Sequence, residues 1–309
     1  MTQIYNFLLF DGFSNLCLAN MVEPLRAANT LAGQQLYAWQ VYSPDGAPVH
    51  SSSGLQVTPQ GAIGGEAGDA LVVMPSYGFL AHSVPETLRA LRRAAGRHSR
   101  LAGLDTGSWL LADAGLLEGH RATIHWDELS RFEEAFPDID VVQERFVIDR
   151  NRITCSGALA AYDLATALIF ADHGPLLSME VAHLLMNRGE PSSASPQMKS
   201  KDGLVNRVVT IMQRKLDDPL LIKDIARQLG CSQKKIEIRV QAELGITPQA
   251  LYRRLRLNLA RKLAVETRQS VAEIADRCGY ENSSAMTRAF RVQFGQTPTA
   301  YRNGKELSN

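Results

Sequence analysis

The sequence predicts a doubly wound α/β sheet domain followed by an all-α domain with two helix-turn-helix units. Two observations carry this prediction. Short apolar runs alternate with amphipathic stretches over residues 1–186, and a unit of about 50 residues occurs twice after residue 204. Strands that alternate with helices are typical of an open, mostly parallel sheet, whereas a repeated helical unit indicates a duplicated module.

The first part of the chain shows this alternation element by element. Residues Ile4 to Phe10 form a continuous apolar run, as expected for a parallel strand buried on both faces. Ligands of such folds bind beyond the carboxyl ends of the strands, so the loops that follow strands are where a site is expected. Helices are predicted over residues 17–32 and 86–96, and further strands over 37–43, 70–74 and 101–104.

A linker and a change in charge separate the two parts. Residues 187–203 are rich in Ser, Pro and Gly and lack hydrophobic periodicity. Residues 1–190 hold 12 Arg, no Lys and 21 acidic residues, which leaves 21 basic and 11 acidic residues for the rest. We therefore predict domains over 1–186 and 204–309, and the basic second domain suggests a polyanionic partner.

Composition excludes several classes of protein. Hydrophobic residues make up 45% of the chain and charged residues 21%, which is ordinary for a soluble globular protein. No run of about 18 apolar residues exists, so neither a membrane span nor a membrane partner is expected. Residues 1–10 lack a basic n-region and are interpreted as a strand rather than a signal peptide, which favours the cytoplasm.

The four cysteines do not form a metal-binding pattern. Cys17, Cys155, Cys231 and Cys278 are too far apart in the sequence for metal-ligand spacing, so no metal and no cofactor are expected. In a reducing compartment they are predicted to be small buried apolar residues.

The second domain contains an internal repeat. Four short segments recur 49 or 50 residues later, and together they define the two units. The pairs are Ile225-Ala226 with Ile274-Ala275, Gly230 with Gly279, Gly245 to Pro248 with Gly295 to Pro298, and Tyr252-Arg253 with Tyr301-Arg302.

Each unit has the pattern of two helices joined by a tight turn. Gly230 and Gly279 supply the left-handed residue that ends the first helix of a pair. Ser232 in the first unit, and Asn282 or Ser283 in the second, are suited to cap the second helix. These second helices carry apolar residues on one face and polar residues on the other.

The polar faces suit DNA. Arg, Asn, Ser and Thr side chains reach base edges, and Lys and Arg reach phosphates. Protein binding by a helical repeat, or a merely solvated basic surface, is the alternative. The candidate DNA-binding residues are Gln233, Lys234, Lys235, Arg239, Asn282, Ser284, Thr287, Arg288 and Arg291.

A basic helix is predicted between the units, over residues 249–266. Eighteen helical residues span about 27 Å. This length could hold two reading heads roughly one groove repeat apart, since half-sites one turn apart lie about 34 Å centre to centre. The helix carries Arg253, Arg254, Arg256, Arg261 and Lys262.

The run from Gly279 to Arg302 resembles the AraC/XylS family of regulators, which carry two helix-turn-helix units joined by a helix. The resemblance covers about 100 residues and implies a double-stranded DNA operator as partner. Two departures stand out. The family usually has aromatic residues where this chain has Ala285 and Met286, so looser packing is expected there. It commonly has Arg at the position of Ile238, so the first unit is expected to read fewer bases, with Lys234, Lys235 and Arg239 serving mainly phosphates.

The loop after the strand at 101–104 carries a second resemblance. Residues 105–126 are similar to the class I glutamine amidotransferase-like superfamily, which implies a flavodoxin-like sheet. That superfamily has a Cys at a sharp strand–helix turn and a His about twenty residues later. This chain keeps the His as His125 but has Asp105 in place of the Cys.

Asp105 argues against the superfamily's acyl-transfer chemistry. The thiolate is the attacking atom there, and a carboxylate is a poor substitute for attack on amides. Cys17 and Cys155 are predicted on other elements and are not expected to replace it. We therefore expect no catalytic residues, with a hydrolase-like enzyme as the rival interpretation.

Asp105 instead suits a cationic ligand. Trp109 follows one helical turn later, and a carboxylate beside a Trp face is a cation-binding combination. The resemblance adds Glu23 as an acidic residue near the turn, and the expected site is completed by Ser76, His125 and Trp126. The alternatives are a helix cap for Asp105, core packing for Trp109 and a structural role for the His–Trp pair.

Nearly the whole chain also resembles regulators of amino acid and quaternary-amine use, such as arginine-, carnitine- and betaine-responsive activators. The resemblance rests on the runs 12–14, 23–29 and 75–78. It implies an activator of a catabolic operon whose effector is a small cationic or zwitterionic amine or amino acid. It also implies a homodimer that contacts RNA polymerase. A first domain that only dimerises is the remaining alternative.

Overall fold

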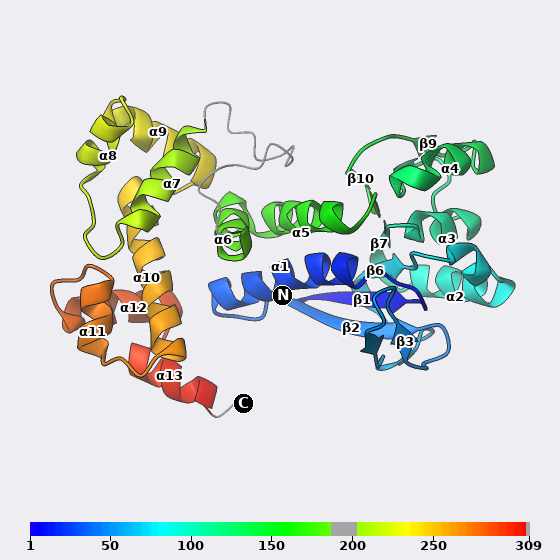
Figure 1. Ribbon diagram of the computed structural model, residues 1–309, viewed down its shortest axis with the longest axis horizontal. Coiled ribbons are helices and arrows are strands. Elements are labelled where there is room, and N and C mark those ends of the chain that lie inside the picture. Colours follow the sequence, from blue (N-terminus) through cyan, green and yellow to red (C-terminus); the bar gives the residue numbers. More distant parts are fainter. Residues whose placement is uncertain (187–202, 307–309) are drawn as a thin grey trace. The chain divides into compact units, whose positions relative to one another are not determined.

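In the computed structural model, residues 1–186 and 203–306 are described, and they divide into two units (Figure 1). The first unit consists of Met1–His173 and Glu180–Leu185, and the second of Gly174–Met179 and the chain from Met186 onward. The predicted linker 187–203, apart from Gly203, lies outside the described residues.

A seven-stranded sheet organises the first unit, in the order β10-β11-β7-β6-β1-β2-β5. All neighbours are parallel except β10, which pairs antiparallel with β11. The doubly wound, flavodoxin-like prediction is therefore confirmed. The strands are β1 (Gln3–Leu9), β2 (Tyr37–Ser43), β5 (Gly61–Ala62), β6 (Gly68–Met74), β7 (His98–Leu104), β10 (Phe146–Asp149) and β11 (Arg152–Cys155); two small ribbons pair β3 (Val49–His50) with β4 (Gln56–Val57) and β8 (Arg121–Ala122) with β9 (Asp140–Val141).

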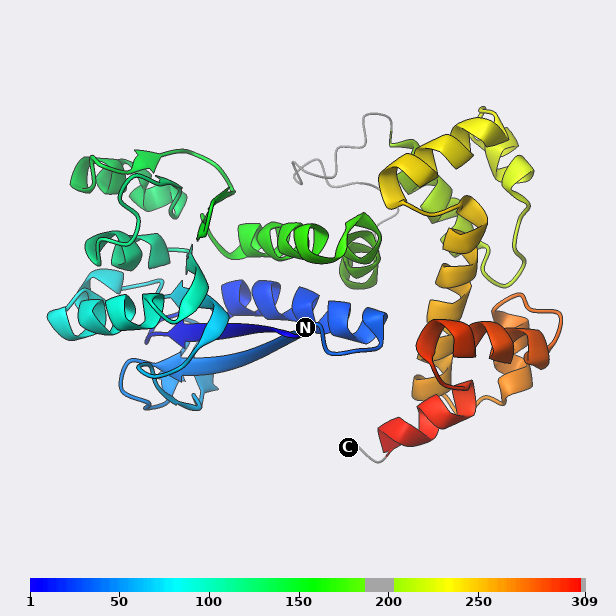
Figure 2. The same cartoon turned by 180° about the vertical axis from the view of Figure 1, so that it is seen from behind.

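Helices cover both faces of this sheet. Helices α1 and α5 run side by side along one face in both ribbon views, and α2 and α3 pack against β6 and β7 (Figures 1 and 2). The helical elements are α1 (Asn15–Ala32), η1 (Phe79–His82), α2 (Pro85–Ala95), α3 (Gly107–Asp113), η2 (Trp126–Glu128), α4 (Leu129–Ala135), α5 (Ala158–His173) and α6 (Pro175–Met186).

The central strand β1 is buried on both faces, as its continuous apolar run predicts. Its side chains from Tyr5 to Leu9 are all less than 2% exposed. Leu8 faces the core beneath α2 and α3, where it packs with Leu71 of β6 and Leu101 of β7. This burial fixes the strand ends from which the loops of the candidate site emerge.

The described residues of the second unit form helices joined by short loops, with no strand among them. Two helix pairs, α8–α9 and α11–α12, lie at the two ends of α10. None of the described helices is both long and apolar enough to cross a membrane. The helices are α7 (Leu204–Arg214), α8 (Ile222–Gln228), α9 (Gln233–Leu244), α10 (Pro248–Glu266), α11 (Val271–Arg277), α12 (Ser283–Phe294) and α13 (Pro298–Glu306).

Helix α10 contributes to two separate apolar cores. Leu251 and Leu255 in its first half pack with α7, α8 and α9. Leu257, Ala260 and Ala264 in its second half pack with α11 and α12. One continuous helix therefore positions both predicted helix-turn-helix units.

Candidate functional site

Asp105 lies on a sharp turn between β7 and α3. Its φ of 61° is in the left-handed region, where only Arg150 joins it among the described non-glycine residues. The turn is tight because α3 approaches β7 and β6 closely. A Cβ on Gly103 would lie 2.6 Å from the backbone nitrogen of Ser108, and one on Gly107 would overlap the carbonyl oxygen of Val73. Glycine at these two positions therefore permits the turn.

The backbone of Asp105 connects three segments at the strand ends. Its N–H donates to the carbonyl of Cys155, at 3.0 Å, at the end of β11. Its own carbonyl accepts the N–H of His125, also at 3.0 Å. The structure thus places His125 beside the turn, through a contact of its backbone.

The side chain of Asp105 is bound by Ser76. The Ser76 hydroxyl donates to Oδ2 of Asp105 at 2.8 Å and accepts the backbone N–H of Ser14 at 3.1 Å. Burial raises the pKa of Asp105, while the Ser76 hydrogen bond and the charge of His125 lower it in part. Among the described residues, no Lys, Arg or His forms an ion pair with this carboxylate.

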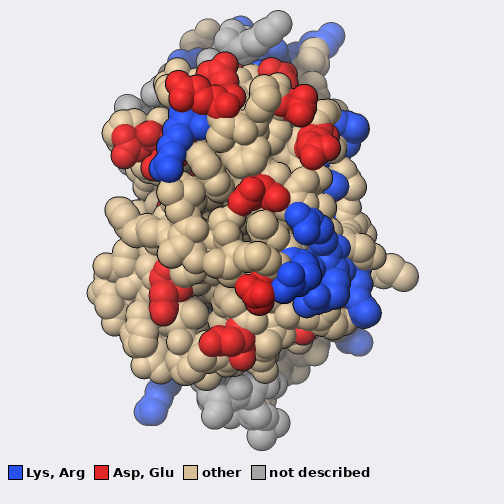
Figure 3. Space-filling model, turned by 90° about the vertical axis from the view of Figure 1, so that its right-hand side faces the viewer, with Lys and Arg blue, Asp and Glu red and all other residues tan. Residues whose placement is uncertain are grey.

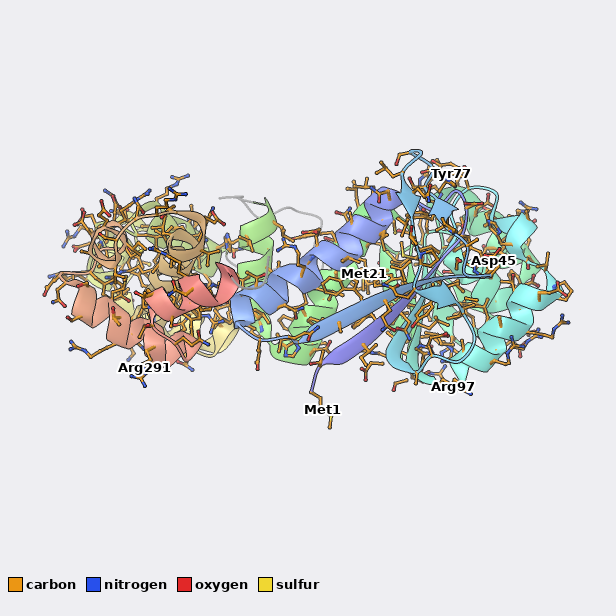
Figure 4. All side chains as sticks on the ribbon, turned by 90° about the horizontal axis from the view of Figure 1, so that it is seen from below. Met1, Met21, Asp45, Tyr77, Arg97 and Arg291 are labelled. Carbon is orange, nitrogen blue, oxygen red and sulfur yellow. The ribbon has the colours of Figure 1, made fainter. Side chains whose placement is uncertain are left out.

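Exposed apolar side chains lie next to the residues that surround Asp105. Trp126 follows His125 and is 70% exposed, and its ring lies 5.5 Å from the His125 ring. Tyr77 follows Ser76, is 73% exposed and lies at the edge of the unit (Figure 4). Leu16 at the start of α1 and Leu159 at the start of α5 are also exposed. A partly buried carboxylate therefore lies among loops that carry apolar surface.

Two cysteines lie close to Asp105, which the sequence did not indicate. Cys17 and Cys155 are fully buried. Burial raises the pKa of Cys17 well above its usual range and that of Cys155 to about 12, and the Asp105 charge adds to both rises. Both thiols are therefore protonated at neutral pH and are not activated nucleophiles. The only signal in the sequence is that Cys17 lies three residues after Ser14, which caps α1. The backbone of Ser14 donates to Ser76, the residue that binds Asp105.

Two predicted ligand residues are placed elsewhere. Trp109 is 7% exposed and packs in the core, with ring centroids 5.4 Å from Phe79 and 5.2 Å from Phe136. Glu23 is exposed and pairs with Arg26 at 2.7 Å. Among the described residues, neither forms a hydrogen bond or an ion pair with Asp105. The site that the structure assembles thus holds Ser76, Asp105 and His125, with Trp126 at its side.

The predicted helix caps and turns of the second unit are present. The Ser232 hydroxyl accepts the N–H of Lys235, and the Asn282 side chain accepts that of Ala285. Gly230 and Gly279 both have positive φ, at 63° and 67°. The polar faces of α9 and α12 therefore start at the residues that the sequence indicated.

Most candidate DNA-binding side chains are exposed, and Arg291 projects outward from α12 (Figure 4). Thr287 is partly buried, and Arg239 is 31% exposed and pairs with Glu243 at 3.1 Å. Gln233 donates to Glu237 at 2.8 Å. The exposed residues are Gln233, Lys234, Lys235, Asn282, Ser284, Arg288 and Arg291.

The predicted basic helix is present as α10, and two of its arginines have structural roles. Arg256 donates to the carbonyls of Cys278 and Gly279, both at 2.6 Å, and its guanidinium lies 4.1 Å from the Tyr280 ring centroid. Arg261 is only 5% exposed and lies over the Phe294 ring. These two arginines hold the second helix pair to α10.

The first unit carries a separate group of arginines. Figure 3 shows scattered acidic side chains and one concentration of Lys and Arg on the face it draws. On α2 and just after it, Arg89 pairs with Glu86, and Arg92 and Arg97 donate to backbone carbonyls. These three arginines therefore have partners within the first unit.

Comparison with protein families matches both units. Residues 6–171 match the DJ-1/PfpI family, and residues 225–304 match a helix-turn-helix domain. The first match covers the sheet and the Asp105 turn, and the second covers both helix pairs.

Relatives with both parts are transcriptional regulators. The HTH-type transcriptional regulator CdhR of Pseudomonas aeruginosa is 36% identical over 97% of this chain and 91% of its own length. The regulator GbdR of the same species is 35% identical over 99% of this chain and 85% of its own length. The regulator ArgR, also from that species, is 29% identical over 97% and 93%.

Solved structures agree on the fold of the first unit. An AraC family transcriptional regulator from Pseudomonas putida has a TM-score of 0.51 at 24% identity, covering 59% of this chain and 99% of its own. A ThiJ/PfpI family protein from Pseudomonas syringae has a TM-score of 0.53 at 22% identity, covering 69% and 87%. The chain therefore belongs to the HTH-type transcriptional regulators that join a DJ-1/PfpI domain to an AraC-type helix-turn-helix domain.

Proposed function

We propose that this DNA-binding regulator senses a small cationic or zwitterionic nitrogen compound at Asp105 and activates a catabolic operon in response. The observation that carries the proposal is the Asp105 carboxylate itself. It is held on a left-handed turn, bound through one oxygen by Ser76, and its pKa is raised by burial. A cation that binds beside it would offset the cost of keeping this charge away from water.

The proposal includes the other partners of a regulator of this kind. The protein acts in the cytoplasm as a homodimer, the second unit binds the operator, and contact with RNA polymerase turns binding into transcription. The effector favours the DNA-binding arrangement only to the extent that it binds that state more tightly.

No catalysis is proposed for the first unit. A carboxylate occupies the sharp turn, and the nearby thiols have raised pKa values and stay protonated. A hydrolase would instead need a nucleophile that attacks at neutral pH.

The test is a thermal-shift screen of the full chain against amines, N-methylated amines and amino acids, with Asp105→Asn alongside. Asn tolerates the left-handed φ better than Ala, so the variant removes the charge and keeps the turn. Asp138→Asn is the matched control, because it removes an exposed carboxylate that has the same charge. A saturable shift in the wild type and the control that is lost in Asp105→Asn supports the site.

Other outcomes count against the proposal. A shift that survives in Asp105→Asn places the effector elsewhere. No shift with any compound, in a folded protein, favours a first domain that only dimerises. Turnover of a tested compound that is lost in Asp105→Asn would favour the hydrolase.

The pH dependence gives a second readout. Because the pKa of Asp105 is raised on folding, the folded protein binds a proton more readily than the unfolded chain, and the carboxylate destabilises the fold as pH rises through the raised pKa. Asp105→Asn should therefore raise the melting temperature at pH 7 and lose this advantage below the usual aspartate range. A cationic effector should bind the wild type more weakly as pH falls through the same window, since protons compete for the carboxylate.

A further inference from the structure

The two recognition helices, α9 and α12, correspond residue by residue. Their N-caps, Ser232 and Asn282, are 50 residues apart, and so are their C-caps, Gly245 and Gly295. The buried pairs that anchor them keep the same offset: Ile236 with Met286, and Val240 with Phe290. Position 238 of the first unit therefore matches position 288 of the second.

The two helices differ in charge at this position. The second unit has Arg288, and the first has Ile238, which is 57% exposed. Ile238 lies about 160° around the helix from the buried Val240, at about 100° per residue. Lys234 and Gln241, one turn before and after it, are also exposed. An apolar side chain thus stands at the centre of a polar reading face.

The chemistry of the major groove identifies a partner for this side chain. An isoleucine offers no hydrogen bond to a base edge. The one apolar group that base pairs present in the major groove is the C5-methyl group of thymine. At the same time, the neighbouring Glu237 is hydrogen-bonded to Gln233 along the helix. At this position α9 therefore offers an apolar contact where α12 offers the charged Arg288.

We propose that Ile238 reads a thymine through its C5-methyl group, so that the first helix-turn-helix unit selects a thymine where the second selects a base that Arg288 can bind. This inference rests on DNA binding by the first helix-turn-helix unit, formed by α8 and α9. Ile238 acts here as a specificity-determining residue. It adds discrimination without adding charge, so it changes sequence preference and leaves the salt dependence of binding unaltered.

The experiment starts from duplexes that the full-length wild type selects from a random library. Each thymine of a selected duplex is then replaced by deoxyuridine, which removes only the methyl group. One replacement is expected to weaken wild-type binding about fourfold, the value of one buried methyl-sized group. Ile238→Ala should bind the thymine and deoxyuridine duplexes equally. Val292→Ala removes an apolar side chain that is 89% exposed from the other recognition helix, and should keep the wild-type sensitivity.

Three results would overturn the inference in distinguishable ways. If no deoxyuridine replacement weakens binding, or if the loss persists in Ile238→Ala, the thymine contact is wrong while DNA binding stands. If the wild type selects no sequence at all, sequence-specific binding fails and the inference falls with it. Circular dichroism of Ile238→Ala checks that the substitution leaves the fold unchanged.

Discussion

The two helix-turn-helix units share one backbone plan but differ in how they are held. Both place a left-handed glycine between the helices and a capping side chain before the recognition helix. A Cβ on Gly230 would meet open space, whereas one on Gly279 would lie 2.6 Å from Cδ of Pro219 and 2.8 Å from the carbonyl oxygen of Leu216. Pro219 and Leu216 belong to the loop between α7 and α8, which leads into the first helix-turn-helix unit.

The second helix-turn-helix unit is therefore packed against the loop before the first helix-turn-helix unit. It is also bound to α10 through Arg256. In the first helix-turn-helix unit, Gly230 has no such close neighbour among the described residues, and the exposed face of α9 carries the apolar Ile238. The difference shows that a duplicated motif can keep its backbone plan while its two copies differ in packing and in the charge of their exposed faces.

The largest effect is expected for Gly279→Ala. The left-handed conformation costs about 1–2 kcal/mol for a residue with a Cβ, and the clash with Pro219 adds about 1–3 kcal/mol. Gly230→Ala has only the first cost. All three tryptophans, Trp39, Trp109 and Trp126, lie in the sheet domain. Tryptophan fluorescence therefore reports the unfolding of the sheet domain alone, whereas far-ultraviolet circular dichroism reports the unfolding of both domains. In urea unfolding of the full chain, Gly279→Ala should lower the free energy of unfolding more than Gly230→Ala does. The change should appear in the circular dichroism signal and not in the fluorescence. Equal losses would contradict the tight contact.

Arg256→Met should destabilise the second unit by about 2 kcal/mol, because it removes two charge-assisted hydrogen bonds to the Cys278 and Gly279 carbonyls. Arg253→Met is the control, since Arg253 is exposed on the same helix. The same unfolding experiment measures both. A loss for Arg253→Met as large as that for Arg256→Met would mean that helix charge in general, and not this contact, stabilises the unit.

On DNA, Arg288→Ala should weaken operator binding about tenfold, whereas Ile238→Ala should weaken it about fourfold. The affinity is measured by fluorescence anisotropy at several salt concentrations. If Arg288 binds a phosphate, the salt slope falls by about 1; if it binds a base edge, the loss is confined to sequences that carry that base. A salt slope that changes for Ile238→Ala would contradict its neutral role.

The smallest expected effect concerns the first helix of each pair. Ser270 and Glu273 form a capping box at the start of α11, whereas Leu221, at the matching position before α8, makes no side-chain cap. Ser270→Ala should cost about 1 kcal/mol, and Leu221→Ser should gain about half of that or more. Leu221 is 60% exposed, so its replacement removes little packing. A destabilising Leu221→Ser would show that this leucine packs where the structure leaves it exposed.

Local patterns predicted much of this structure. The apolar run of β1, the glycine turns and the capping residues depend on neighbours in sequence, and they were correctly placed. The loop at Asp105 was chosen because it follows a predicted strand, and the resemblance to the amidotransferase-like superfamily implied a sharp turn there.

The errors concern contacts between distant segments. Trp109 lies one turn after Asp105, but every residue from 107 to 112 is buried, so spacing could not show which face of α3 meets the ligand side. The closeness of Cys17 to Asp105 depends on how α1 lies across the sheet. Arg256 and Arg261 look like solvent-exposed charges in the sequence, and only the packing of α10 against α11 and α12 shows their role.

The contact of Gly279 with Pro219 also bears on how operators can evolve. The close approach of Gly279 to Pro219 and the continuous helix α10 both join the two helix-turn-helix units, so we expect the number of base pairs between their half-sites to matter as much as the bases themselves. One inserted pair turns the far half-site by about 35° and moves it by about 3.4 Å, which rigid heads cannot follow. Base substitutions would therefore grade the strength of a promoter under this regulator, while a single insertion or deletion in the spacer would silence it.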